Sequence, residues 1–103
     1  MTLTGKWKIT AKIPLGKMNL TADFVADEAA GTFTGTATND ADGAVYQVAN
    51  GKLDGNHIDY DMVIRFGIIP FNFPLSGEFF EDGTCKGVGR AAKMQGSYEG
   101  YKL

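Results

Sequence analysis

The side chains that can carry acid–base chemistry in this sequence are few. Three tyrosines and one cysteine alternate with polar neighbours so that they fall on the expected inner face of β-strands: Tyr46, Tyr60, Tyr98 and Cys85. A tyrosine hydroxyl can orient a carbonyl group or donate a proton. Tyr60, Tyr46 and Tyr98 are therefore the candidate catalytic residues, although a tyrosine in such a position is more often a hydroxyl with no chemical role.

Nucleophilic and metal chemistry find little support. Cys85 is the single cysteine, so an intramolecular disulfide and a cysteine-rich zinc site are excluded. The single histidine, His57, falls on the opposite strand face from Cys85, which argues against a cysteine–histidine pair. The segment 39–43 resembles part of a calcium loop, but Thr38 and Ala49 stand where ligands are needed. We expect no metal and no cofactor.

An acidic surface is expected beside His57. The alternation places Asp59 and Asp61 on the outer face of one strand, and a four-residue loop brings Glu78 opposite Asp59. Like charges directly opposite one another are mildly destabilising. Arg65 can offset them, so a solvated charged face is the favoured interpretation.

The composition describes one ordinary globular domain. The chain has 103 residues, 44% hydrophobic and 21% charged, which is enough for one core and suggests a single domain over 1–103. The formal net charge of −2 gives no basic footprint for nucleic acid or an anionic membrane. No apolar run resembles a signal peptide or a membrane span, so a cytoplasmic protein is expected.

The first strand organises the rest of the chain. Residues 3–13 alternate almost without a break, with Trp7 on the apolar face and lysines and threonines on the other. A second strand over 18–26 shows the same period. A four-residue loop from Pro14 would place Ile13 opposite Met18 and Trp7 opposite Phe24.

The remaining strands follow at short intervals. They are expected at residues 32–38, 44–49, 57–66, 71–79, 84–91 and 97–103, with a short piece around 52–53. About eight strands joined by short loops favour an all-β, antiparallel up-and-down barrel. Pro74 is the misfit, because a proline inside a strand cannot donate to the ladder, and it predicts a bulge or a seam.

Two stretches resemble avidin-type barrels. Residues 3–7 (Leu-Thr-Gly-Lys-Trp) and 31–36 (Gly-Thr-Phe-Thr-Gly-Thr) are similar to the opening of that family, and Gly-x-Trp also resembles the broader calycin group. The resemblance implies an eight-stranded barrel with a ligand in its mouth. It does not carry over biotin binding, because Ile9 and Ala37 replace the Asn and Tyr of avidins. In calycins a late arginine packs on the first-strand Trp, which implies that role for Arg90.

The barrel interior has two interpretations. Small inner-face residues can leave an apolar cavity toward one mouth, or they can sit opposite large residues and leave the interior packed. We expect the cavity, with an apolar or aromatic small molecule in it. The expected ligand-binding residues are Trp7, Met18, Phe24, Tyr60, Met62, Phe73 and Cys85.

Three functions stay open at this stage. The first is binding of that hydrophobic small molecule; the second is a cofactor-free isomerase, cyclase or lyase that uses a tyrosine as its acid or base. The third is a packed structural or interaction domain. Outward apolar residues on several strands also suggest a homodimer or higher homo-oligomer if they gather into one patch: Val25, Val63, Phe80 and Val88.

Overall fold

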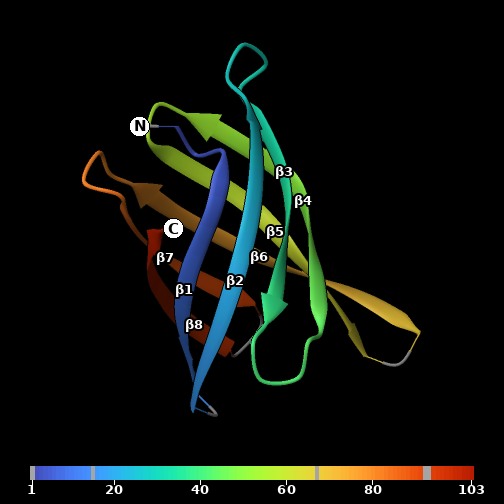
Figure 1. Ribbon diagram of the computed structural model, residues 1–103. Helices are drawn as coiled ribbons and strands as arrows, with labels where there is room; N and C mark the ends of the chain where they lie inside the picture. Colours follow the sequence, from blue (N-terminus) through green and yellow to red (C-terminus); the bar gives the residue numbers. More distant parts are fainter. Residues whose placement is uncertain (1, 15, 67, 92–93) are drawn as a thin grey trace.

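Eight antiparallel strands close into a barrel in the computed structural model (Figure 1), which describes residues 2–14, 16–66, 68–91 and 94–103, apart from the side chains of 66, 91 and 94. Each strand pairs with the next along the chain, and β8 returns to β1. The expected up-and-down barrel is therefore confirmed. The strands are β1 (Gly5–Ile13), β2 (Gly16–Asp27), β3 (Thr32–Asn39), β4 (Val45–Asp54), β5 (His57–Phe66), β6 (Ile69–Phe79), β7 (Thr84–Ala91) and β8 (Met94–Lys102).

The first hairpin is tighter than expected. Ile13 pairs with Gly16 and Trp7 pairs with Ala22, so the predicted pairing of Trp7 with Phe24 is wrong by two residues. Gly16 has a φ of 133°, a conformation that side chains disfavour and that lets the strands pair up to a shorter turn. Because the shift is two residues, every side chain keeps its predicted face.

The β5–β6 hairpin shows the same error. Phe66 pairs with Ile69, so its loop also has fewer residues than predicted. Asp59 consequently faces Ser76, and His57 faces Glu78. The expected opposition of Asp59 and Glu78 is wrong, and a histidine–carboxylate pair takes its place.

One strand replaces the two pieces expected over 44–53. β4 runs without interruption through Asn50 and Gly51, with a register shift against both β3 and β5 at this point. Asn50 takes a φ of 54°, as bulged residues often do. A Cβ at Gly51 would lie 2.2 Å from the carbonyl oxygen of Phe33, so only glycine fits there. β8 likewise begins at Met94 rather than Ser97.

Pro74 marks the place where β6 leaves the barrel wall. The pairing of β6 with β7 ends at Leu75 and Gly89, whereas β6 and β5 stay in unbroken register through Pro74 and Asp61. The predicted bulge is absent from this register. A proline is tolerated here because the strand has no β7 partner on that side. Beyond it the β5–β6 hairpin projects from the barrel (Figure 1, yellow).

Candidate functional site

The inner face of the barrel is buried to different depths at its two ends. One end of the barrel carries the β2–β3, β4–β5 and β6–β7 loops and both chain termini (Figure 1). The large inner side chains at this end are buried. We call this the sealed end. Its inner residues are Leu3, Trp7, Phe24, Phe33, Ile58, Phe79 and Cys85.

The N-terminal residues close the sealed end. Leu3 is 1% exposed, and Trp7, which is 0% exposed, donates from Nε1 to the Leu3 carbonyl oxygen at 2.9 Å. The Lys102 ammonium donates to the Thr2 carbonyl oxygen at 2.8 Å and lies 5.9 Å from the centre of the Trp7 ring. Lys102 therefore takes the cation–π role expected of Arg90, whose exposed side chain is on the outer face.

The opposite end is lined by apolar side chains that are only half-buried. On β1, β2, β5 and β6 the burial of inner residues falls toward this end, whereas Ala37 on β3 stays buried. We call this the open end. Its inner residues are Ala11, Met18, Tyr46, Val48, Met62, Phe73 and Leu75.

The projecting hairpin extends this apolar surface. Phe71 and Phe73 share the inner face of β6, with ring centroids 6.5 Å apart. At the hairpin tip Ile68 is 91% exposed and Ile69 is 67% exposed. Inner-face side chains therefore form a continuous apolar wall that begins inside the barrel and runs out along β5 and β6.

A layer of aromatic rings separates the two ends. Edge-to-face contacts link Phe24 to Phe33, Phe33 to Tyr60 and Tyr60 to Tyr98, with centroids 5.6, 5.4 and 6.4 Å apart. Such contacts add to the stability that burial provides. Tyr98 lies toward the open end of this layer, because it pairs with Ala11, whereas Tyr60 lies across β4 from Phe33.

Burial changes the acidity of the groups in and below this layer. It raises the pKa of Tyr98 to about 12 and that of the Cys85 thiol to about 11. Burial, together with the nearby Tyr98 hydroxyl, raises the pKa of Tyr60 well above its usual value. All three groups are therefore uncharged at neutral pH.

Rings occupy the space above the inner glycines of β6 and β7. A Cβ at Gly77 would lie 2.2 Å from the Tyr98 hydroxyl, and one at Gly87 would lie 2.4 Å from the same oxygen. The Phe73 ring and the Leu75 side chain cover Gly89 in the same way. On this wall the small residues serve packing, as the packed interpretation predicted.

The structure divides the residues expected to bind a ligand. Met18, Met62 and Phe73 lie at the open end. Tyr60 lies in the adjoining layer of aromatic rings. The remaining three lie at the sealed end: Trp7, Phe24 and Cys85. Of the candidate catalytic tyrosines, Tyr46 is half-buried at the open end, opposite Ala37. Sequence reasoning did not include Val48 and Leu75 among the ligand-binding residues, although the alternation of β4 and β6 places both on the inner face.

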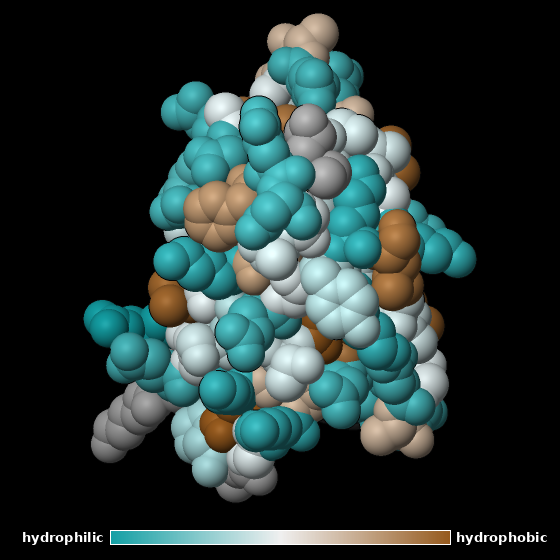
Figure 2. Space-filling view, turned by 60° about the vertical axis from the view of Figure 1, so that its left-hand side comes forward, coloured by the Kyte–Doolittle hydropathy of each residue, from teal (hydrophilic) through white to brown (hydrophobic). Residues whose placement is uncertain are grey.

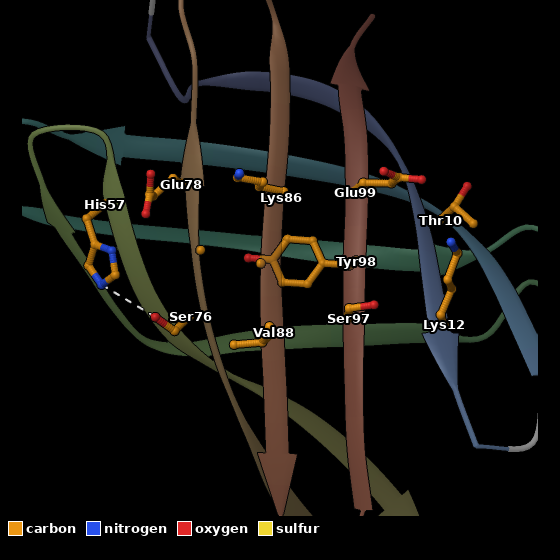
Figure 3. A pocket seen from close by; sticks show the side chains of 12 residues that line it. Thr10, Lys12, His57, Ser76, Glu78, Lys86, Val88, Ser97, Tyr98 and Glu99 are labelled. Carbon is orange, nitrogen blue, oxygen red and sulfur yellow. Dashed lines mark hydrogen bonds between the residues drawn. The ribbon is translucent and has the colours of Figure 1, made fainter.

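The outer face carries a polar groove of about 420 Å³ over β5, β6, β7, β8 and β1. Figure 3 shows a row of side chains that crosses these strands, with the Tyr98 ring beneath β7. The three central residues of this row, Glu78, Lys86 and Glu99, alternate in charge, which favours cross-strand attraction. The row is His57, Glu78, Lys86, Glu99 and Thr10.

His57 lies between a hydroxyl and a carboxylate, as the histidine of a catalytic triad does. Its Nε2 is 3.4 Å from the Ser76 hydroxyl oxygen and 3.1 Å from Asp59 Oδ2. In a serine–histidine–acid triad the carboxylate holds the other ring nitrogen. Both partners compete for Nε2 here, so this is a surface hydrogen-bond cluster. The predicted register did not indicate this cluster, because it placed Ser76 away from Asp59 and His57.

The outward apolar residues do not form one patch. Val25 is 59% exposed but pairs with Thr34, and Val88 pairs with Ser76 and Ser97. On the face shown in Figure 2, apolar side chains lie singly among polar ones. The basis expected for an oligomer interface is therefore absent from these residues, and a homo-oligomer stays a prediction.

Comparison with known proteins gives no family. No protein-family profile matches the chain, and no curated protein is significantly similar to it. Within the described part of the chain, no group of three or more histidine, cysteine, aspartate or glutamate side chains could hold a metal ion. Nor do the described residues include a helix long and apolar enough to cross a bilayer.

Proposed function

We propose that this protein binds an apolar small molecule at the open end of its barrel. The observation that carries the proposal is the difference in burial along the inner face. The same alternating pattern gives complete burial at one end and half-exposed Met18, Met62 and Phe73 at the other. Apolar surface at the mouth of a barrel is a common location for a ligand.

Burial of these side chains by a ligand is favourable. Each square ångström of apolar surface removed from water contributes about 25 cal/mol, so a ligand that covers the open end gains hydrophobic stabilisation. Met18 and Met62 suit such a site because methionine adapts its shape to irregular apolar partners. Phe71 and Phe73 on the projecting hairpin extend the contact surface beyond the mouth.

The resemblance to avidin-type and calycin barrels agrees with this placement. The resemblance implies a ligand in the mouth of the barrel, and Trp7 of the Gly-x-Trp motif lies at the sealed end, away from the proposed site. The proposal needs no biotin-binding residues, and Ile9 and Ala37 stand in their places. The ligand class follows instead from the apolar residues at the open end.

The acidity of the tyrosines favours binding over catalysis. With pKa values raised by burial, Tyr60 and Tyr98 stay protonated and are poor general bases at neutral pH. A cofactor-free enzyme at this site would have to use a protonated tyrosine as its acid and a base from elsewhere. We therefore place the enzyme alternative second.

A titration with the apolar fluorophore Nile red tests the proposal. The Met62→Glu variant places a charge at the open end and should weaken binding by about tenfold or more. Val25→Glu is the matched control, because Val25 is on the outer surface and its substitution should leave the affinity unchanged. Circular dichroism confirms that both variants are folded.

Two results would overturn the proposal. One is an absence of saturable binding by the wild-type protein to Nile red and to a panel of apolar compounds. The other is an equal affinity of folded Met62→Glu, Val25→Glu and wild type, which would place any binding elsewhere on the surface.

A further inference from the structure

One polar group in the barrel interior lacks a partner. The Tyr98 hydroxyl belongs to a residue that is 7% exposed, and it makes no hydrogen bond with any described residue. A buried hydroxyl without a hydrogen bond costs about 1–3 kcal/mol, and such groups are rare in native proteins. A hydrogen-bond partner from outside the chain would satisfy this group.

The position of the hydroxyl is fixed by the barrel wall. The Tyr98 ring runs from β8 over Gly87 of β7, and its oxygen stands above Gly77 of β6 (Figure 3). The Tyr60 ring borders it at a centroid distance of 6.4 Å. Burial raises the pKa of Tyr98, and the interaction with the Tyr60 hydroxyl partly offsets that rise, as a hydrogen bond from Tyr60 would, although the two hydroxyls do not meet hydrogen-bond geometry.

The inward-facing residues beside Tyr98 on β1 and β8 are small. Ala11 on β1 pairs directly with Tyr98, and Gly96 is the next inward-facing residue of β8 toward the open end. Neither carries more than a methyl group. On the other side Phe73 and Leu75 lie over Gly89. Because the Tyr98 hydroxyl stands above Gly77, a ligand from the open end would have to pass Leu75 on β6 to meet it.

We propose that the Tyr98 hydroxyl donates a hydrogen bond to an uncharged acceptor oxygen of the bound ligand, such as the carbonyl of a ketone, aldehyde or ester. The inference rests on the proposed function and narrows its ligand class from any apolar molecule to an apolar chain with a neutral carbonyl end. A phenol that remains protonated to high pH is a donor throughout the neutral range.

The absence of a nearby cation decides that the acceptor is neutral. Among the described residues, no lysine, arginine or histidine is buried in the core; Lys12 and Lys86 lie on the outer face of the sheet (Figure 3). A carboxylate at Tyr98 would lose its hydration without gaining an opposite charge, which is strongly unfavourable. A neutral carbonyl has a far smaller desolvation cost and accepts the same hydrogen bond.

Three probes of equal chain length separate these contributions: octane, 2-octanone and octanoate. Displacement of Nile red gives the affinity of each. The wild-type protein should bind 2-octanone about three- to tenfold more tightly than octane, the difference in affinity that one neutral hydrogen bond provides. It should bind octanoate more weakly than 2-octanone. Tyr98→Phe should remove the preference of 2-octanone over octane and leave the affinity for octane unchanged.

Tyr60→Phe is the matched control, because it removes the neighbouring hydroxyl and leaves Tyr98 in place. It should keep the preference for the ketone. A readout independent of affinity is the infrared carbonyl band of carbon-13-labelled 2-octanone. In the wild-type complex it should shift to lower frequency relative to the ketone in hexane, and this shift should be missing with Tyr98→Phe.

The outcomes distinguish the inference from the proposed function. If all three probes fail to bind, the proposed function fails and the inference fails with it. If 2-octanone and octane bind equally well to wild type and to Tyr98→Phe, the open end binds apolar molecules and the role of Tyr98 is wrong. Loss of the preference in Tyr60→Phe instead of Tyr98→Phe would also contradict it. The infrared shift of the wild-type complex decides the question even if Tyr98→Phe fails to fold.

Discussion

The two ends of the barrel are built from the same strands and differ in what covers them. At the sealed end residues 2–4 fold over Trp7, and Lys102 holds them in place. At the open end the β5–β6 hairpin projects away, and Met18 and Met62 stay half-buried. The difference teaches that strand alternation determines which face is apolar, whereas the segments at the strand ends determine whether that face is closed.

The first prediction compares one large residue from each end. Trp7→Ala should lower the free energy of unfolding by about 3–5 kcal/mol, because it leaves a cavity in a fully buried site. Met62→Ala should cost less than half as much, since that side chain is already half-exposed. Urea unfolding followed by circular dichroism measures both. Equal losses in the two variants would contradict the difference between the ends.

The second prediction removes the cover of the sealed end. Leu3→Ala should lower the free energy of unfolding by about 2–3 kcal/mol and should expose the Trp7 ring. Quenching of Trp7 fluorescence by acrylamide reports that exposure, and it should rise severalfold. Leu103→Ala, at an exposed position near the same end, is the control and should leave the quenching unchanged. Unaltered quenching in Leu3→Ala would show that Leu3 is not the cover.

The third prediction uses thiols as reporters of pH and access. Burial raises the pKa of Cys85 from 9.0 to about 11, so the folded protein binds that proton more tightly than the unfolded chain. The stability this contributes is complete below pH 9 and is lost as the pH rises through 11. Cys85→Ala should therefore lose less stability than wild type between pH 9 and pH 11, as urea midpoints across that range would show.

The same thiol compares the two ends directly. At pH 8 Cys85 should react with a thiol reagent such as DTNB only slowly, because it is buried at the sealed end. A thiol placed at the open end by Met62→Cys, in a Cys85→Ala background, should react at least tenfold faster. Similar rates for the two thiols would mean that the open end is as closed as the sealed end.

The fourth prediction concerns the tip of the projecting hairpin and has the smallest effect. Ile68→Ser should change the free energy of unfolding by less than about 0.5 kcal/mol, because the residue is 91% exposed. It should weaken Nile red binding by less than Met62→Glu does, since the tip lies beyond the mouth. A destabilisation comparable to Leu3→Ala would show that the tip packs against the barrel.

The fold was predictable from the sequence because the alternation is strong and the loops are short. The faces of Trp7 and Tyr98 follow from period two, and a register error of two residues leaves the faces unchanged. Loop length was predicted less well, because proline and glycine at 14–16 are compatible with more than one turn. A second error of the same size, in the loop of the β5–β6 hairpin, displaced His57 and Ser76 from each other.

The site was only partly predictable. Inner-face positions follow from alternation, so Met18, Met62 and Phe73 could be named in advance. Depth along the barrel could not, because it depends on which residues cover each end, and nothing in the pattern of residues 2–4 indicates that they form a cover. The unpartnered Tyr98 hydroxyl was equally invisible, since it depends on the glycines across which the ring lies.

The most direct test of the account uses one reporter at each end of the barrel. Carbon-13 labels on the methionine methyl groups report on Met18 and Met62, and the indole N–H of the single tryptophan reports on the sealed end. We would titrate the doubly labelled protein with 2-octanone and record both sets of NMR signals. The account predicts that the Met18 and Met62 methyl signals shift in a saturable way while the Trp7 indole signal stays in place. A shift of the Trp7 signal without a change in the methionines would contradict it.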